Sequence, residues 1–303
     1  MGVGTAALLW MLAASGDGAQ DRPARAPQTD ETVPVSRGAR LAIDNFAGEV
    51  VIHTWDRDSL RVQARHGSRT KVVIRLGTSS VAVSAMSSTG PSGAVDYDIT
   101  APSWMPMKIE GQYNDVTIDG AQSEVSVVTV RGDISIKGGS GTITGKTIQG
   151  EVVVEGARGK VNFSSVNQGI KITESSGEIV AETTNGSITL THVTSNSIDV
   201  ATINGDVTYE GTLADNGRYS FATHNGDIAL TVPESSNATF DVWTYNGEFT
   251  TTLPVKGPER SEARRGKRAS YTLGNGGAEV AMESFGGEIT LRRAGAPRTG
   301  RRQ

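Results

Sequence analysis

Four segments of the chain repeat one short pattern: TTNGSITL (183–190), ATINGDVTY (201–209), FATHNGDIAL (221–230) and WTYNGEFTT (243–251). Each contains Asn-Gly, then Ser, Asp or Glu, then an apolar residue. With this glycine as position 0, the pattern extends in both directions along the chain. Spacings between neighbouring anchors are 18 to 21 residues, except for a final spacing of 40. The anchors are Asn114, Gly132, Gly150, Gln168, Gly186, Gly205, Gly226, Gly247 and Gly287.

The columns of this alignment alternate in character. Positions −7, −5 and +2 are mostly apolar, and position −3 is always Thr or Ser from Thr129 to Ser284. A period of two is typical of a strand with one buried face. Six glycines also fall on a nine-residue grid, with Gln168 in the one remaining slot: Gly132, Gly141, Gly150, Gly159, Gly177 and Gly186. This grid divides each repeat into two halves, each a short strand and a turn.

A fixed period of this length indicates stacked units that bury their apolar faces against one another. The sequence therefore predicts an all-β fold, a single-stranded parallel β-solenoid (β-helix) with coils of 18–21 residues. Asn-Gly suits a sharp turn because both residues tolerate positive φ, and stacked asparagines are expected to bond along the axis. A run of two-residue hairpins also favours Asn-Gly, but hairpins require no column every 18 residues.

The flanking segments define the predicted domain organisation. Residues 1–20 contain the apolar run GTAALLWMLAAS (4–15) and are predicted to be a signal peptide, with a disordered N-terminus as the alternative. Residues 21–36 are predicted to be a disordered linker, and 37–110 an irregular β region that caps the repeats. In that region LAIDNFAGEVVIHTW (41–55) resembles one degenerate unit with its turn at Gly48.

The C-terminal part carries two charged segments. Repeats are predicted over 111–292, and the spacing of 40 predicts one coil with a loop inserted at 255–270. Residues 293–303 contain four arginines and are predicted to be a basic disordered tail, with binding to an anionic surface as the alternative.

Composition excludes several classes of protein. The 303 residues carry a net charge of −4, which argues against a nucleic-acid partner. The chain has no cysteine, so it contains no disulfide, no zinc–cysteine site and no lipobox for a lipid anchor. Beyond the N-terminal run, no apolar stretch is long enough for a membrane helix, so the mature chain is predicted to lack a transmembrane segment.

The order of the segments resembles a known family. The opening unit LAIDNFAGEVVIHTWDRDSLRV (41–62), the segment VDYDITAPSWMPMKIEGQYNDVTIDG (95–120), the repeats and the closing unit YTLGNGGAEVAMESFGGEITLRR (271–293) are similar to the bacterial DUF4097 family, often labelled as adhesins. The similarity covers roughly residues 38 to 292. It implies a β-helix-like fold on an exported protein, with some relatives linked to cell-envelope stress, and it brings no catalytic residues.

Common catalytic and metal-binding motifs do not emerge. The histidines (His53, His66, His192 and His224) have no metal-ligand spacing, and no complete nucleotide-binding or hydrolase motif is present. The RGD at 131–133 falls in the turn columns, so we interpret it as accidental. GGSGTI (138–143) resembles a calcium nonapeptide but has Ile143 in the aspartate position. The sequence thus assigns no catalytic, cofactor-binding or metal-binding residue and no cofactor.

The most informative constellation is position +1. Asp115, Asp133 and Glu151 form one acidic run, and Asp206, Asp227, Glu248 and Glu288 form another. Stacked carboxylates suit glycan cleavage or cation binding, but we interpret them as a solvated turn edge, because like charges at this spacing in water repel only weakly. Small flanking residues predict no pocket around them. The core columns also hold the aromatics Tyr219, Phe221, Phe240 and Phe249, which leaves no evident sugar platform.

These observations lead to a functional hypothesis. The sequence favours an exported, non-catalytic solenoid, periplasmic or on the cell surface, that acts as a scaffold or adhesin-like interaction module at the bacterial envelope. Its partner is expected to be an envelope protein or a glycan. The alternatives are a carbohydrate-active β-helix enzyme (lyase or hydrolase) and a component of envelope-stress signalling.

Overall fold

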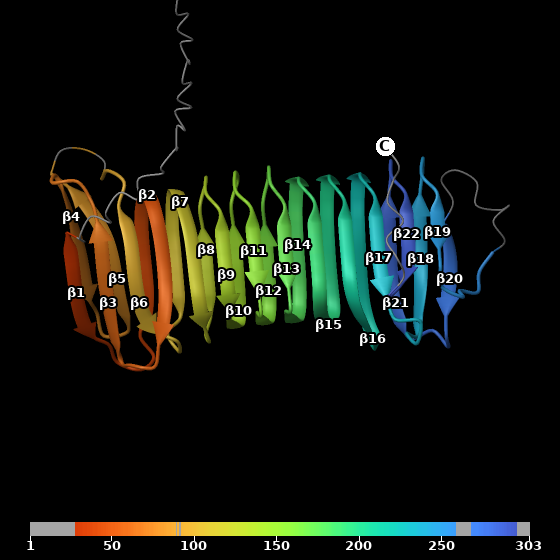
Figure 1. Ribbon diagram of the computed structural model, residues 1–303, viewed down its shortest axis with the longest axis horizontal. Helices are drawn as coiled ribbons and strands as arrows, with labels where there is room; N and C mark the ends of the chain where they lie inside the picture. Colours follow the sequence, from red (N-terminus) through yellow and green to blue (C-terminus); the bar gives the residue numbers. More distant parts are fainter. Residues whose placement is uncertain (1–27, 89, 91, 259–267, 296–303) are drawn as a thin grey trace, which may run out of the picture.

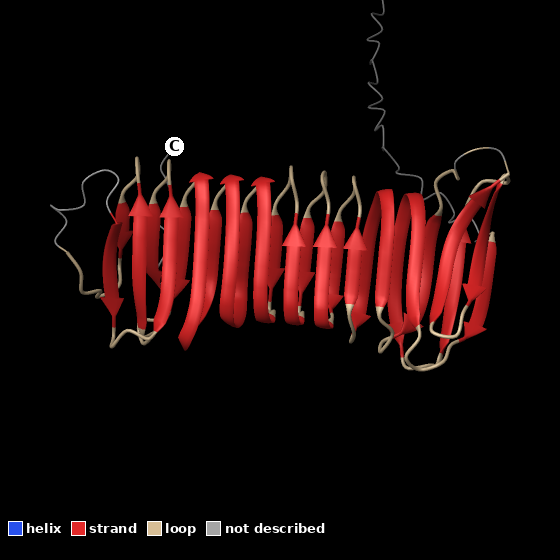
Figure 2. Cartoon of the chain, turned by 180° about the vertical axis from the view of Figure 1, so that it is seen from behind, coloured by secondary structure: helices blue, strands red, loops and turns tan. Residues whose placement is uncertain are grey.

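The computed structural model describes residues 28–88, 90, 92–258 and 268–295. Within these ranges the chain forms 22 strands and no helix, and the strands lie side by side along one elongated body (Figures 1 and 2). The predicted all-β class is confirmed. The strands are β1 (Thr29–Pro34), β2 (Arg40–Trp55), β3 (Ser59–Arg65), β4 (Thr70–Leu76), β5 (Ser80–Ser87), β6 (Asp96–Pro102), β7 (Met107–Ala121), β8 (Val125–Val128), β9 (Ile134–Gly138), β10 (Ser140–Lys146), β11 (Val152–Glu155), β12 (Arg158–Ser164), β13 (Ile170–Thr173), β14 (Ser176–Asn185), β15 (Ile188–Asn204), β16 (Val207–Asn225), β17 (Ile228–Val232), β18 (Ala238–Thr244), β19 (Phe249–Thr251), β20 (Arg268–Leu273), β21 (Ala278–Ser284) and β22 (Ile289–Arg293).

Most strands pair in parallel with the strand one repeat away. Val152 of β11 is opposite Ile170 of β13, Ile170 is opposite Ile188 of β15, and Ile188 is opposite Val207 of β16. These partners are separated by the same 18 or 19 residues as the sequence anchors. The parallel pairing therefore rules out the alternative of consecutive two-residue hairpins.

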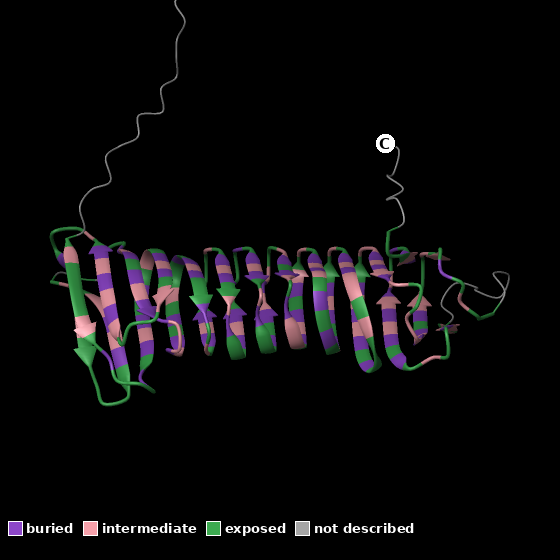
Figure 3. Cartoon of the chain, turned by 60° about the horizontal axis from the view of Figure 1, so that its bottom comes forward, coloured by how far each residue is buried: buried purple, intermediate pink, exposed green. Residues whose placement is uncertain are grey.

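Each repeat contributes one strand to each of two arrays. β8, β10, β12 and β14 form one array, and β9, β11 and β13 form the other; β15 and β16 are long enough to bend through both. The apolar side chains of the two arrays form a continuous core. Along the strands, buried residues alternate with intermediate and exposed ones (Figure 3). Neighbouring sizes complement each other there, because Gly145 leaves the space that the ring of Phe163 fills.

The order of the last repeats in space differs from their order in sequence. β21 and β22 lie between the repeat of β16 and β17 and the repeat of β18 and β19. Stacking in chain order would place the Gly247 repeat beside the Gly226 repeat, but the Gly287 repeat separates them. β20 pairs antiparallel with β18, and this reversal of the chain brings the final repeat back into the stack.

A similar arrangement occurs near the N-terminus. β2 lies between β7 on one side and β5 and β6 on the other, with Gly48 opposite Asn114 as the sequence alignment implies. Antiparallel strands then cover this end, because β3 pairs with β6 and β4 pairs with β5. The first and last repeats of the described chain thus lie inside the stack rather than at its ends.

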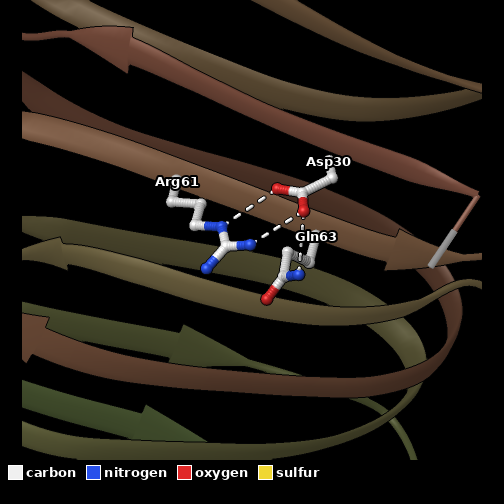
Figure 4. A network of polar contacts seen from close by, with 3 residues as sticks. All are labelled: Asp30, Arg61 and Gln63. Atoms are coloured by element: carbon white, nitrogen blue, oxygen red, sulfur yellow. Dashed lines mark hydrogen bonds and ion pairs between the residues drawn. The ribbon is translucent and has the colours of Figure 1, made fainter. Parts of the chain in front are cut away.

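The predicted disordered linker at 21–36 is partly wrong. Thr29–Pro34 form β1, which pairs antiparallel with β3. The guanidinium of Arg61 donates two hydrogen bonds to the carboxylate of Asp30, at 2.9 and 2.8 Å, and the Gln63 amide donates a third at 3.1 Å (Figure 4). Charge and proline content suggested a linker because β1 is exposed and presents few apolar residues.

Several predicted segments fall outside the described residues. These are the signal peptide at 1–20, residues 21–27 of the linker, residues 259–267 of the inserted loop and residues 296–303 of the basic tail. The described ends of the inserted loop are ordered: Lys256 forms an antiparallel bridge with Thr272, and Arg268 begins β20. Among the described residues, no helix has the length and apolarity required to span a membrane.

Candidate functional site: the turn edge

The turns at the anchors align along one edge of the stack, which we call the turn edge. The buried hydroxyls of position −3 hold these turns together. Thr183 donates to the carbonyl oxygen of Gln168, Thr202 to that of Gly186, and Thr223 to that of Gly205, each at 2.9 Å. The predicted Thr column is thus confirmed, and each hydroxyl fastens one turn to the preceding one.

Close stacking explains the anchor glycines. A Cβ placed on Gly150 would collide with the carbonyl of Gly132, and the same holds for Gly205 above Gly186. Neither Gly150 nor Gly205 has a φ in the left-handed region, so the expectation that Asn-Gly supplies positive φ is wrong at these turns. Glycine is required there because the next backbone approaches too closely for any side chain.

The asparagines form the ladder that their spacing predicts. The side-chain amide of Asn225 donates to Oδ1 of Asn204 at 2.9 Å, Asn204 donates to Asn185 at 2.8 Å, and Asn185 donates to Asn167 at 3.2 Å. All four lie exposed at position −1 of successive repeats. Each side-chain amide donates a hydrogen bond to the asparagine of the neighbouring repeat. The column therefore presents hydrogen-bonded amides to solvent.

The acidic column at position +1 is also a ladder. Oδ1 of Asp206 accepts the backbone amide of Asp227 at 2.9 Å, and Oδ1 of Asp227 accepts that of Glu288 at 2.8 Å. Asp115 and Asp133 act in the same way towards the next repeat, at 2.9 and 2.7 Å. The aspartates therefore have a structural function, since each one binds a backbone N–H that the turn would otherwise leave without a protein partner.

A trough lies beside part of this acidic column. It has a volume of about 500 Å³ and is lined by Asp206, Asp227, Glu288 and Arg292, together with threonines of β16, β19 and β22. The expectation that the acidic residues lack any pocket is therefore wrong for the repeats near the C-terminal end. The changed order of the repeats places Glu288 rather than Glu248 next to Asp227 in this trough.

Position −2 contains a feature that the sequence analysis missed. The ring of Phe285 stacks on His224 with a centroid distance of 4.7 Å and on Tyr245 with 4.9 Å, with interplanar angles of 7° and 3°. At the other end Phe46 contacts Tyr113 edge-on at 5.7 Å. The signal in the sequence is the run of apolar residues at position −2. It was not recognised because the fold is predicted from the inward-facing columns alone.

The remaining sequence candidates are dispersed. His66 contacts the Thr29 hydroxyl at 3.0 Å, His53 and His192 are exposed on other parts of the stack, and His224 belongs to the aromatic stack. No group of three or more His, Cys, Asp or Glu among the described residues has the geometry to hold a metal ion.

The two short motifs also occupy structural positions. In the RGD segment, Gly132 lies at an anchor, Asp133 belongs to the acidic ladder, and Arg131 lies over the Tyr113 ring at 5.7 Å. In GGSGTI, Ile143 is fully buried in the core.

Comparison with known proteins supports the family resemblance. The model of the Toastrack family, DUF4097, matches residues 38–292. No curated protein matches the chain. A solved structure from Clostridium sporogenes ATCC 15579, described as a putative cell adhesion protein, is 9% identical; the match covers 88% of this chain and 99% of that chain, with a TM-score of 0.21.

Proposed function

Since the chain belongs to the Toastrack family DUF4097, we propose that it is an exported, non-catalytic scaffold or adhesin-like module of the bacterial envelope. In this proposal the repeats form a single-stranded parallel β-solenoid, and the turn edge presents the interaction surface. Support for the solenoid comes from the parallel register, which advances by one repeat from strand to strand. The apolar segment at 4–15 supports export.

The observation that carries the non-catalytic proposal is the bonding of the acidic column. A general acid or nucleophile needs a carboxyl group free to contact substrate, with its pKa adjusted by the site. Here Asp206 and Asp227 each use one oxygen to hold the backbone of the next repeat. The same bonds recur at Asp115 and Asp133. They are therefore a feature of the repeated turn and do not mark a single site.

The trough supports one alternative function, that of a carbohydrate-active enzyme. It brings Asp206, Asp227 and Glu288 together with Arg292 and several hydroxyl groups, which are suitable contacts for a sugar. An assay of the purified protein on a panel of bacterial, plant and host polysaccharides distinguishes the two candidates. We expect no product from any of them. Turnover that disappears in Asp227→Asn, with thermal stability retained, would establish the enzyme instead.

Export has a separate test. Expression of the full chain in a bacterial host, followed by fractionation and immunoblotting, should place a shortened form in the envelope or the medium. Deletion of residues 4–15 should leave the protein in the cytosol. Full-length protein confined to the cytosol in both cases would contradict export.

A further inference from the structure

An exposed apolar stripe runs along the turn edge. It consists of side chains at position −2, with Tyr113 at position −1. Adjacent members lie one repeat apart, except where Thr184 and His224 occupy position −2. Among the described residues, nine large apolar side chains are exposed, and six of them lie in this stripe. The stripe is formed by Phe46, Tyr113, Val130, Ile148, Val166, Ile203, Phe285 and Tyr245.

Stacking within the stripe leaves much of this surface uncovered. Ile203 retains 49% of its accessible surface and Tyr245 retains 46%, although each has neighbours in adjacent repeats. Outward-facing positions elsewhere on the arrays are mainly polar or small. An exposed apolar surface bordered by polar residues is typical of a site where another molecule binds.

Charge beside the stripe restricts the partner. The acidic ladder follows three positions later in every turn, so it runs parallel to the stripe on the other side of the asparagine column. Nine of its eleven positions carry a carboxylate, and the other two are Gly169 and Ser187. In spatial order the carboxylates are Asp96, Glu49, Asp115, Asp133, Glu151, Asp206, Asp227, Glu288 and Glu248.

We propose that the apolar stripe binds an extended, basic polypeptide segment of a partner protein whose apolar side chains alternate with Lys or Arg. In an extended segment, alternate side chains point to opposite sides, so one set can contact the stripe while the longer basic side chains reach the acidic ladder. A second copy of this chain is disfavoured, because its own stripe is bordered by acidic residues and offers the acidic ladder no row of basic side chains. This inference depends on the proposed role as an interaction module and specifies its surface and partner class.

A peptide titration tests the proposal on the purified protein lacking residues 1–27. The probe is a fluorescein-labelled peptide of alternating lysine and valine, about twelve residues long, measured by fluorescence anisotropy. We expect saturable binding that weakens at high salt, because charges near the surface are screened. Peptides of alternating Lys and Ser, or Glu and Val, should bind at least about tenfold more weakly, since each lacks one of the two contacts.

Matched variants locate the binding surface. The triple substitution Val130→Ser, Ile148→Ser and Ile203→Ser should lower affinity by at least about tenfold. Leu76→Ser is the control, since Leu76 is an exposed apolar side chain on β4 and is opposite Val81, whose partner Leu41 lies five residues before Phe46. Glu151→Gln with Glu248→Gln should reduce both affinity and salt dependence, whereas Glu31→Gln on β1 should change neither.

Each outcome of these experiments either supports or overturns the proposed binding surface. Equal loss in the Leu76→Ser control, equal binding of the Lys and Ser peptide, or dimerisation through the stripe in sedimentation would overturn the proposal. If the triple variant does not fold by circular dichroism, Tyr245→Ser replaces it with the same criterion. Failure of peptide binding in a protein that is exported and inactive on polysaccharides removes this inference alone and leaves the proposed function intact.

Discussion

At the scale of single residues, hydrogen bonding distinguishes two buried tyrosines. The Tyr209 hydroxyl donates to the carbonyl oxygen of Thr212 at 2.7 Å, whereas the Tyr97 hydroxyl has no hydrogen-bond partner among the described residues. Burial raises the pKa of both phenols above the ordinary value of 10. Neither tyrosine is therefore expected to ionise near neutral pH, and their difference lies in hydrogen bonding.

The first prediction compares two substitutions, each of which removes one phenolic hydroxyl. Tyr97→Phe should leave the free energy of unfolding unchanged or raise it by about 1 kcal/mol, because it removes an unsatisfied polar group. Tyr209→Phe should lower it by about 1 kcal/mol, because the Thr212 carbonyl loses its donor. Urea denaturation of both variants measures the difference. A larger loss for Tyr97→Phe than for Tyr209→Phe would contradict this account of the hydrogen bonds.

The second prediction concerns an anchor glycine. Gly150→Ala should destabilise the protein by about 1–3 kcal/mol or more, because the new methyl group meets the Gly132 carbonyl and forces the turns apart. Gly67→Ala is the control, since a Cβ there would meet nothing within 4 Å. Thermal denaturation should separate the two variants clearly, and equal melting temperatures would show that close stacking does not select glycine at the anchor.

At the scale of the strand, inward and outward residues should differ sharply. Ile188 is fully buried between Ile170 and Val207, while Thr189 on the same strand faces outwards and is partly exposed. Ile188→Asp should cost several kcal/mol because it buries a charge without a partner. Thr189→Asp should cost less than about 1 kcal/mol. Similar urea midpoints for the two variants would mean that the assigned faces of β15 are wrong.

The attachment of β1 should depend on pH. Hydrogen bonding from Arg61 is the main reason why the pKa of Asp30 lies below its ordinary value of 3.8. A depressed pKa in the folded state stabilises the fold above the ordinary value, and this contribution is lost as pH falls through the folded pKa. Hydrogen-exchange protection factors of Thr29–Pro34 should therefore decrease below about pH 4.

Asp30→Asn is the control for this pH effect. It should lower β1 protection near neutral pH and remove most of the decrease in acid, because the titrating carboxylate is gone. An unchanged decrease in the variant would assign the pH dependence to another group.

At the scale of the whole molecule, the sequence predicted the repeat but not its complete spatial order. Periodicity identified the inward columns, the Thr column and the Asn ladder, because each depends only on residues within one repeat and its neighbour. The order Gly226, Gly287, Gly247 was not predictable in this way, since any repeat with the same columns fits beside any other. The exposed stripe was missed because apolar residues at position −2 do not contribute to the buried pattern.

Disulfide cross-linking tests the central claim, that the final repeat lies between the two preceding ones. The chain contains no cysteine, so an introduced pair reports without interference. Ala229 is directly opposite Thr290, whereas Thr250 lies on the far side of Thr290. Neighbouring parallel strands are about 4.8 Å apart, a separation that a disulfide can bridge, and twice that distance is too long. Under mild oxidation Ala229→Cys with Thr290→Cys should form a disulfide, and Ala229→Cys with Thr250→Cys should remain reduced; the opposite result would contradict the observed order.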